Sequence, residues 1–346
     1  MIKPSTYLKR FDGNPIIEPK SQHRWESSQT FNPGAILLED KVHILYRAIG
    51  DDGISRFGYA SSEGGYAVEE RLEYPVYEHA ISSSAFNVYS YSSGGSYGGA
   101  EDPRIVRIAG EDFIYMTYTA CDAGLSMAIT SIKIDDFLNS KWNWAKPTLI
   151  SPPGQVHKNW VIFPEKINGK YAILHTLKPR IMVSYHESLS LEPNDHLNSY
   201  NSGPATRRRD VWDNIVRGAG APPIKTEFGW LLFYHAMTQR EYGKYKVGAM
   251  LLDLKDPSII ISRSANPVLE PTEVYENSGF KPGIIYLTGA VVKDGELLVY
   301  YGASDSYVCV ASCGLDEILD NLIEGNKNRR INLPKNNSMK FIGEEN

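Results

Sequence analysis

Carboxylates, basic groups and aromatic side chains gather at a few short motifs of this sequence. Glu101-Asp102-Pro103-Arg104 places two carboxylates and a guanidinium side by side, and its proline restricts the backbone that presents them. An arginine beside a carboxylate is often a structural ion pair, so this motif alone fits a salt bridge as well as a reactive site. Residues in other motifs are expected to reach the same cavity: Asn32, Arg47, Lys158, Asn159, Trp160, His175, Tyr234, His235 and Asp305. Carboxylates, cations and aromatic rings around one cavity are typical of glycosidic or phosphoryl chemistry.

The elements that position these groups repeat five times along the chain. Each repeat is an acidic or glycine-bearing turn followed by an apolar run, and the runs close at Tyr46, Tyr118, His175, His235 and Tyr301. The closing residues are 57 to 72 positions apart, a period that suits a four-stranded blade with loops. A strand candidate with a polar start precedes each turn, and another strand candidate follows each run. The pattern predicts an all-β fold, a five-bladed β-propeller with its active site at the central axis.

The repeat also predicts a single domain over residues 1–346. Although 346 residues exceed the usual size of one hydrophobic core, a radial repeat grows by adding blades. The blades are expected at roughly 30–80, 98–150, 157–200, 215–265 and 283–320, with a polar C-terminal tail over 326–346. The one convincing helix candidate is Leu315–Ile323. The Ser/Gly/Tyr-rich segment Ser82–Gly99 is either a substrate-facing lid or a solvated linker.

Composition disfavours several other classes of protein. The net charge of −5 gives no reason to expect nucleic-acid binding, and Arg207–Arg209 is the one basic run. The N-terminus lacks the apolar region of a signal peptide, and no stretch reaches the length of a membrane span, so we expect a cytoplasmic enzyme. The three cysteines lack zinc-site spacing and are expected to be ordinary buried thiols. No metal or cofactor is expected, and the sequence leaves open whether the chain forms homo-oligomers.

Several ordered motifs resemble glycoside hydrolase family 130, and together they run from about residue 11 to residue 320. They are Phe31-Asn-Pro-Gly34, Ala100-Glu-Asp-Pro-Arg104, His157-Lys-Asn-Trp-Val-Ile-Phe-Pro-Glu-Lys166, Gly218-Ala-Gly-Ala-Pro-Pro-Ile-Lys225, Tyr234-His-Ala-Met237, Gly248-Ala-Met-Leu-Leu-Asp-Leu254 and Tyr300-Tyr-Gly-Ala-Ser-Asp305. The resemblance implies a five-bladed propeller that acts on a small β-mannoside, as a mannoside phosphorylase or as a β-1,2-mannosidase.

The same resemblance implies roles for individual residues. Asp102 falls on the position of the catalytic acid, which in this inverting family is thought to protonate the leaving oxygen through a sugar hydroxyl. Its neighbour Glu101 would raise the pKa of Asp102 and Arg104 would lower it, and the sequence does not settle the balance. The positions expected to hold or flank the mannose are Asn32, Trp160 and Asp305.

The nucleophile is the open question at this stage. Family phosphorylases carry arginines near the positions of Ser126 and Thr176, where this chain has no basic residue. That difference favours exo-acting hydrolysis of β-1,2-linked mannosides, with Glu187 or Glu241 as the base that activates water. The alternative is a phosphorylase that uses inorganic phosphate and releases α-mannose 1-phosphate, and a non-catalytic sugar-binding propeller is the second alternative. Cations that would rebuild a phosphate site are Lys178, Arg180, Arg207–Arg209 and Arg217.

Overall fold

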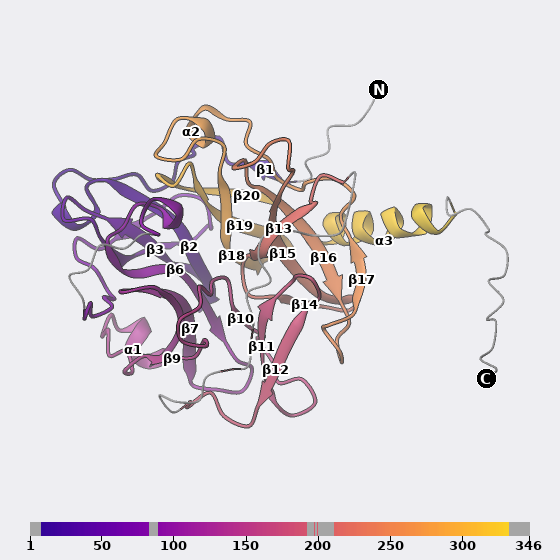
Figure 1. Ribbon diagram of the computed structural model, residues 1–346, viewed down its shortest axis with the longest axis horizontal. Coiled ribbons are helices and arrows are strands. Elements are labelled where there is room, and N and C mark those ends of the chain that lie inside the picture. The colour runs from indigo at the N-terminus through magenta and orange to yellow at the C-terminus, as the bar shows by residue number, and fades with distance from the viewer. Residues whose placement is uncertain (1–7, 83–88, 192–196, 198, 200–210, 332–346) are drawn as a thin grey trace, which may run out of the picture.

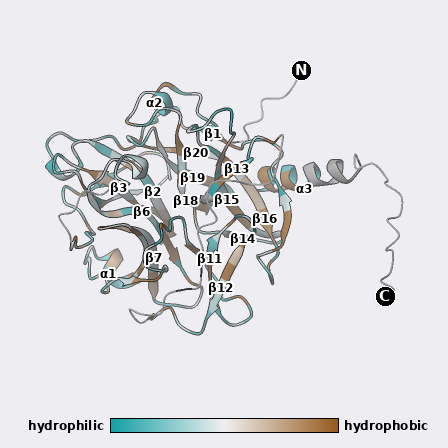
Figure 2. Cartoon of the chain, in the orientation of Figure 1, coloured by the Kyte–Doolittle hydropathy of each residue, from teal (hydrophilic) through white to brown (hydrophobic). Residues whose placement is uncertain are grey.

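A computed structural model describes residues 8–82, 89–191, 197, 199 and 211–331 of the protein (Figure 1). Within these residues β-strands dominate, as the repeat predicts. The hydrophobic colour in Figure 2 concentrates on the strands, while the connecting loops are mostly polar. Central strands such as β15 are buried along their whole length, because neighbouring sheets cover both of their faces. No helix in the described part of the chain is long and apolar enough to cross a membrane.

The strands group into five antiparallel units that follow one another along the sequence, and each predicted apolar run is the second strand of its unit. The first unit is β2 (Gln29–Leu38), β3 (Lys41–Ile49), β4 (Ile54–Ser62) and β5 (Glu70–Arg71), and the second is β6 (Gly98–Arg107), β7 (Phe113–Cys121), β8 (Leu125–Lys133) and β9 (Thr148–Leu149). The third is β10 (Val161–Ile162), β11 (Tyr171–Thr176) and β12 (Met182–His186), and the fourth is β13 (Ile215–Ala219), β14 (Ile224–Thr226), β15 (Gly229–Met237), β16 (Lys246–Leu252) and β17 (Ile260–Arg263). The fifth is β18 (Ile285–Lys293), β19 (Glu296–Ala303), β20 (Tyr307–Gly314) and β1 (Lys9–Arg10). Strands β4 and β6 also pair in parallel over two residues each, and this pairing joins the first two units.

The N-terminal strand β1 completes the fifth unit, a feature that the sequence pattern missed. Lys9 and Arg10 pair antiparallel with Ser312 and Ala311 of β20. The connection continues beyond β1, because the backbone N–H of Ile16 donates to the carbonyl of Val308 at 2.9 Å. The chain therefore closes the arrangement by bringing its first strand onto its last.

Hydrophobic cores lie between successive units and run completely around the molecule. Five buried clusters each draw residues from two neighbouring units: first and second, second and third, third and fourth, fourth and fifth, and fifth and first. Representative pairs across these cores are Leu45 with Ile105, Val106 with Ile162, Leu174 with Trp230, Leu231 with Ile285, and Ile44 with Leu298. The five units thus form a closed ring with one apolar layer at each junction.

In three units a buried hydrogen-bond network connects the second strand to the outermost strand. In each, a tyrosine hydroxyl donates to a buried carboxylate that also contacts an arginine. The members are Tyr46, Glu26 and Arg71; Tyr234, Asp213 and Arg263; and Tyr301, Glu276 and Arg10. A buried carboxylate is costly unless it is paired and hydrogen-bonded, and these partners satisfy it.

The helices are few and peripheral. They are α1 (Ile134–Leu138), α2 (Val274–Asn277) and α3 (Leu315–Ile331). The predicted helix at Leu315–Ile323 is confirmed, and it extends further into the expected polar tail. Ile318, Leu319 and Leu322 of α3 pack against the core between the fourth and fifth units. The three cysteines are buried thiols, as expected: Cys121, Cys309 and Cys313.

Candidate active site

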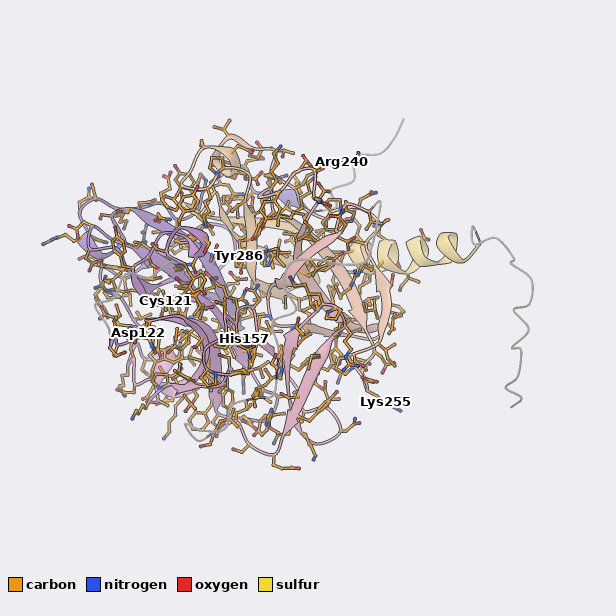
Figure 3. All side chains as sticks on the ribbon, viewed as in Figure 1. Cys121, Asp122, His157, Arg240, Lys255 and Tyr286 are labelled. Atoms are coloured by element: carbon orange, nitrogen blue, oxygen red, sulfur yellow. The ribbon has the colours of Figure 1, made fainter. Side chains whose placement is uncertain are left out.

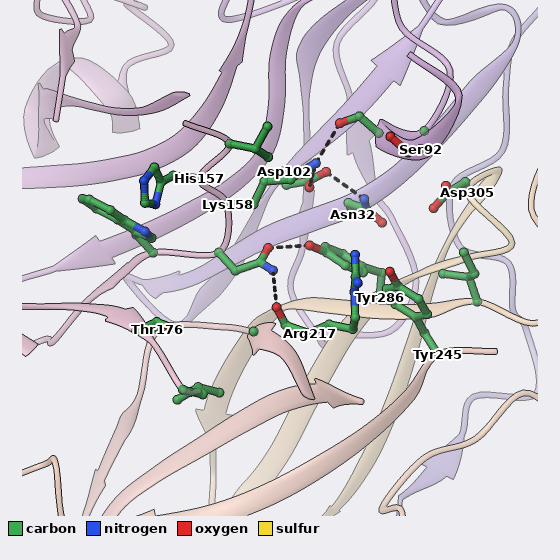
Figure 4. A pocket seen from close by; sticks show the side chains of 18 of the residues that line it. Asn32, Ser92, Asp102, His157, Lys158, Thr176, Arg217, Tyr245, Tyr286 and Asp305 are labelled. Atoms are coloured by element: carbon green, nitrogen blue, oxygen red, sulfur yellow. Dashed lines mark hydrogen bonds and ion pairs between the residues drawn. The ribbon is translucent and has the colours of Figure 1, made fainter. Parts of the chain in front are cut away.

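A cavity of about 310 Å³ opens where the inner strands of the units meet (Figure 4). Its lining includes many of the predicted residues: Asn32, Arg47, Asp102, Lys158, Asn159, Trp160, His175 and Asp305. These residues come from the first, second, third and fifth units, so the ring brings together groups that lie far apart in the sequence. The volume lies near the lower end of the range for small-molecule sites.

Local backbone irregularities turn the key side chains into this cavity. Asn32, Asp102 and Asn159 have φ values of 47°, 56° and 68°, in the left-handed region that asparagine and aspartate tolerate better than most residues. The strand register shifts between Phe31 and Gly34 and between Glu101 and Arg104, where an Asn-Pro or Asp-Pro pair interrupts the ladder. Such bulges re-aim side chains and are common beside active sites.

Close packing between inner strands requires glycine at two positions. A Cβ atom on Gly34 of β2 would lie 2.7 Å from the carbonyl oxygen of Pro103 in β6. One on Gly289 of β18 would lie 2.8 Å from the carbonyl oxygen of Pro33. The two bulges therefore lie close together because the intervening residues lack side chains.

Asp102 lies buried at the centre of a network of cations and amides. Asn32 Nδ2 donates to Asp102 Oδ1 at 2.8 Å, and Arg47 Nη1 donates to the same oxygen at 3.1 Å. Lys158 Nζ lies 3.3 Å from the other oxygen, Oδ2. Both carboxylate oxygens of Asp102 therefore face positive charge or a hydrogen-bond donor.

Glu101 supports this network from behind the cavity. Its carboxylate accepts hydrogen bonds from Arg47 Nη2 and Lys158 Nζ, each at 3.0 Å. The hydroxyls of Ser93 and Ser96 donate to it as well. Glu101 thus fixes the same two cations that contact Asp102, and it ties them to the segment at Ser93–Ser96.

These charges decide the protonation of the cluster. Burial works to raise the pKa of Asp102, but Lys158, Arg47 and Arg104 together with the Asn32 hydrogen bond outweigh it and lower that pKa strongly. Burial likewise works against the charged form of Lys158, yet Asp102 and Glu101 raise the pKa of its amine. Asp102 is therefore ionised in the unliganded protein. The cations around it lower its pKa more than burial and Glu101 raise it, a comparison that the sequence left open.

Arg104 joins the second unit to the third and fourth. Its guanidinium donates to the main-chain carbonyls of Asp102 at 2.9 Å and Gly220 at 3.0 Å, and to Asn159 Oδ1 at 2.8 Å. The hydroxyl of Tyr286, on β18, donates to the same Asn159 oxygen (Figure 4). Arg104 is buried outside the cavity lining, so its contacts position the site across three units and do not reach into the cavity.

Asp305 and Lys281 form the side of the cavity that belongs to the fifth unit. Lys281 Nζ lies 3.3 Å from Asp305 Oδ2, and burial raises the pKa of Asp305 although Lys281 and Arg47 oppose that effect. Gln29 Nε2 donates to the carbonyls of Asp305 at 2.7 Å and Gly94 at 2.9 Å. The Ser-rich segment and the fifth unit are thereby held together at the cavity.

Two histidines that line the cavity, and a third behind the lining, are neutral at ordinary pH. The ring of His175 stacks on Trp160 with a centroid distance of 4.4 Å, and burial lowers the pKa of His175 to about 4. Burial also lowers the pKa of His157. His235 is fully buried against Tyr286, with centroids 4.1 Å apart, and burial with the nearby Arg104 lowers its pKa to about 3. These rings carry no positive charge, and His235, which was expected to reach the cavity, lies outside its lining.

Lys178 and Arg217 supply a further basic region. Both line the cavity, and burial together with the nearby Arg217 lowers the pKa of Lys178 to about 8. The guanidinium carbon of Arg217 lies 5.5 Å from the centroid of the Tyr245 ring.

Other predicted residues lie outside the cavity. Glu187 follows β12, whose end pairs with Tyr171 at the start of β11, whereas the cavity lies at the other end of β11 near Thr176. Its carboxylate is exposed and pairs with Lys170 at 2.8 Å. That position does not fit the predicted role of Glu187 as a base, because the strand length separates it from the reacting groups.

Glu241 also lies off the lining, although its neighbour Tyr242 contributes to it. The Glu241 carboxylate pairs with Lys246 at 3.0 Å and with Lys244 at 3.5 Å. Tyr234 donates to Asp213 in the core between the third and fourth units and does not reach the cavity. The predicted cation Arg180 is exposed outside the lining, and the predicted Arg207–Arg209 lie outside the described residues.

The sequence did not single out several residues that the structure brings to the cavity. They are Tyr242, Tyr245, Lys281 and Tyr286, whereas Ser92 and Gly94 belong to the segment Ser82–Gly99 that was expected to be either a lid or a linker. Lys281 and Tyr286 lie just before and within the first strand of the fifth repeat. The polar start of the first strand in each repeat was the available signal. In the fifth repeat this strand, β18, begins at Ile285, a few residues earlier than expected.

Comparisons with known proteins agree with this geometry. A family model described as beta-1,4-mannooligosaccharide phosphorylase matches residues 7–324. The chain belongs to glycoside hydrolase family 130. Among family 130 relatives, a 1,2-beta-oligomannan phosphorylase of Thermoanaerobacter sp. (strain X514) is 34% identical over 324 residues, which cover 90% of this chain and 98% of the relative.

Two further family 130 proteins give the same result. A beta-1,2-mannobiose phosphorylase of the same Thermoanaerobacter strain is 33% identical and covers 88% of this chain and 96% of its own. The structure of the beta-1,2-mannobiose phosphorylase from Listeria innocua in complex with beta-1,2-mannobiose matches with a TM-score of 0.68 and 26% identity, over 92% of this chain and 99% of that one. The protein is therefore a family 130 enzyme that acts on β-mannosides.

Proposed function

We propose that this enzyme is a β-1,2-mannoside phosphorylase that releases α-mannose 1-phosphate. The sequence favoured hydrolysis because Ser126 and Thr176 stand where cations were expected, but the two Thermoanaerobacter relatives support the alternative, since both are phosphorylases. The observation that carries the proposal is the basic region formed by Lys178 and Arg217, which offers a site for phosphate at other positions of the same cavity.

The charge of the cavity supports an anionic co-substrate. Five basic side chains line it, namely Arg47, Lys158, Lys178, Arg217 and Lys281, against the two carboxylates Asp102 and Asp305. Arg47 and Lys158 contact Asp102, and Lys281 contacts Asp305. Lys178 and Arg217 also line the cavity, and an amine beside a guanidinium suits a phosphate dianion, which binds through charge-assisted hydrogen bonds.

The carboxylates of the cavity give less support to hydrolysis. An inverting hydrolase needs a second carboxylate as base, on the far side of the sugar from the acid. Among the described lining residues Asp305 is the single carboxylate besides Asp102, and Lys281 pairs with it. Hydrolysis would therefore depend on Asp305, because Glu187 and Glu241 lie outside the cavity.

In the proposed reaction, a phosphate oxygen held by Arg217 and Lys178 attacks the anomeric carbon of the terminal mannose. The bond between that carbon and the bridging oxygen breaks, and the configuration inverts from β to α. Asp102 supplies the proton that the bridging oxygen takes up, by way of a sugar hydroxyl. The products are α-mannose 1-phosphate and a mannoside shorter by one unit.

The ionised state of Asp102 has a defined place in this scheme. The arrival of a phosphate dianion at Arg217 and Lys178 adds negative charge to the cavity, and this raises the pKa of Asp102 so that the carboxylate can take up a proton from solvent. In the synthetic direction the ionised carboxylate is already the base that accepts a proton from the acceptor sugar. Asp102 in the unliganded cavity thus has the ionised state that synthesis requires, and phosphate binding favours the protonated state that phosphorolysis requires.

The proposal includes the architecture. Five antiparallel units, five shared cores and the closure by β1 support a five-bladed β-propeller with the cavity at its axis. The contacts of Arg104 with Gly220 and Asn159 support it too, because they span the axis between the second unit and the third and fourth.

The experiment is incubation of the purified protein with β-1,2-mannobiose, with and without phosphate, and separation of the products. We expect α-mannose 1-phosphate and mannose in phosphate, and negligible turnover without it. Replacement of Arg217 by methionine should raise the apparent KM for phosphate about tenfold or more, because a charge-assisted hydrogen bond contributes roughly 1.5–3 kcal/mol. Equal release of mannose with and without phosphate would instead establish hydrolysis.

The matched control is Arg240→Met. Arg240 is exposed on the edge of the molecule and does not line the cavity, whereas Tyr286 and His157 lie near the centre (Figure 3). The same substitution there removes one positive charge from the protein without touching the site. A KM for phosphate that rises equally in both variants would show that net charge, and not the Arg217 contact, is responsible.

A further inference from the structure

Two exposed aromatic rings border the cavity on the side of the fifth unit. The side chains of Tyr91 and Phe280 are 70% and 41% exposed, and their ring centroids lie 5.8 Å apart. Their chain neighbours Ser92 and Lys281 line the cavity. The apolar surface of the two rings is therefore continuous with the site.

The loops that carry these rings are fixed in place. Lys281 Nζ donates to the carbonyl of Ser92 at 3.1 Å and lies 5.4 Å from the Tyr91 centroid. The Phe280 ring also packs on Gly95, where a Cβ atom would lie 2.8 Å from it. Exposed aromatic rings on braced loops form a preorganised binding surface, which reduces the entropy lost on binding.

A third aromatic residue faces the cavity from the fourth unit. Tyr242 lines the cavity with its side chain 68% exposed. The loops of the fourth and fifth units touch beside it, because the N–H of Tyr245 donates to the carbonyl of Gly283 at 2.9 Å. The rim thus carries aromatic side chains on both of these loops.

We propose that Tyr91 and Phe280 form a sugar-binding platform for mannosyl units that extend out of the cavity, so that the enzyme prefers β-mannoside chains over the disaccharide. This inference rests on the proposed function and deepens it. The cavity of about 310 Å³ is small for an oligosaccharide, and further units must lie along its rim. The apolar C–H faces of a pyranose match flat aromatic rings, and Tyr91 adds a hydroxyl for sugar hydroxyls.

Sequence identity alone does not tell whether this enzyme prefers long β-mannoside chains or the disaccharide. The oligomannan phosphorylase and the mannobiose phosphorylase of Thermoanaerobacter are 34% and 33% identical to this chain. Identity at that level does not distinguish a long substrate from a short one. A platform outside the cavity distinguishes the two substrates, because a long chain contacts it and the disaccharide does not reach it.

The test compares kcat/KM for phosphorolysis of β-1,2-mannobiose and β-1,2-mannotetraose. For Tyr91→Ala and Phe280→Ala we expect kcat/KM to fall about five- to tenfold on the tetraose and to stay within twofold on the biose, in line with an aromatic contact of roughly 1–1.5 kcal/mol. Tyr91→Phe keeps the ring and should keep the preference. The control Phe228→Ala removes a ring that is 43% exposed at the turn before β15, at the end of the strand away from the cavity.

Each outcome is decisive for the platform. Equal losses on both substrates, or none on either, would overturn it, since a disturbed Lys281 would impair the disaccharide as well. Titration calorimetry with mannotetraose provides a readout that does not need phosphorolysis: binding should weaken by the same factor in the two alanine variants. An enzyme that forms no sugar phosphate but shows that loss of binding would refute the proposed function and keep the platform.

Discussion

Replacement of Asp102 by asparagine is the sharpest test of the proposed chemistry. The amide keeps the shape of the side chain and still accepts a hydrogen bond, but it neither supplies nor accepts the proton. Loss of general acid–base catalysis costs about 10² to 10⁴ in rate. We expect kcat for phosphorolysis to fall by at least that range.

The same change also removes a buried charge, and this effect has to be separated from chemistry. Asp102 and Glu101 share Arg47 and Lys158, so either substitution leaves these cations with one carboxylate. Breaking a buried ion pair costs roughly 3–5 kcal/mol of stability. Glu101→Gln is therefore a matched variant, because it makes the same charge change in the same cluster at a residue that does not line the cavity.

The assay measures initial rates at saturating β-1,2-mannobiose and phosphate, together with urea unfolding of each variant. Both variants should lose similar stability, whereas Asp102→Asn should lose at least tenfold more in kcat than Glu101→Gln. The reasoning would be refuted if Asp102→Asn stayed within tenfold of Glu101→Gln. The cluster would then act through its electrostatic field, and the proton would come from another group.

Two further predictions concern the packing and the titration of the site. Gly302→Ala would place a Cβ atom 2.1 Å from Asn32 Oδ1, so we expect a loss of about 1–3 kcal/mol in urea unfolding and at least a fivefold lower kcat/KM, while Gly64→Ala, with open space around it, should change neither. The pKa values of His175 and His235 are lowered to about 4 and about 3, so the unfolded chain binds protons that the folded protein does not as pH falls below about 6.5. Stability should therefore fall by about 2 kcal/mol for each histidine between pH 7 and pH 5. His235→Gln should remove about 2 kcal/mol of the loss between pH 7 and pH 5 in unfolding measurements, and an unchanged slope would contradict the burial of a neutral ring.

The order of strands was predictable because it depends on local pattern. Each apolar run after a turn became the second strand of a unit, as for Phe113–Thr119 in β7 and Glu296–Gly302 in β19. The pairing of β1 was not predictable in this way. Lys9 and Arg10 make a strand of two residues with no periodicity, and only the distant β20 defines it.

Site residues were predictable where their motif lies on an inner strand. They were not predictable where the course of a loop determines whether a residue lies at the cavity. Asn32, Asp102 and Asn159 follow from the polar strand starts, and all three line the cavity. Glu187 was placed wrongly relative to the cavity, because the sequence does not say at which end of the unit the loop after β12 lies. The protonation of Asp102 depends on Lys158, which comes from another unit and is invisible to the local sequence.

The closure by β1 has a consequence for the way this protein forms and fails. Lys9 meets Ser312 across about three hundred residues of chain, and closing a loop of that length costs about 5 kcal/mol in chain entropy. The N-terminal segment also has no partner until β20 has been synthesised, so the last step of folding joins the first residues made to nearly the last, which is slow.

Continuous chain links each of the first four units to the next, and the segment between β1 and β2 links the fifth unit to the first. The seam of the ring therefore lies where β1 pairs with β20, and contacts such as the pair between Arg10 and Glu276 at 2.7 Å help to hold β1 in place. The seam is therefore the place where the ring opens first on heating. Because the cavity needs Asn32 and Asp305 from the two sides of that junction, the lifetime of the activity is set by the seam and not by the chemistry at Asp102.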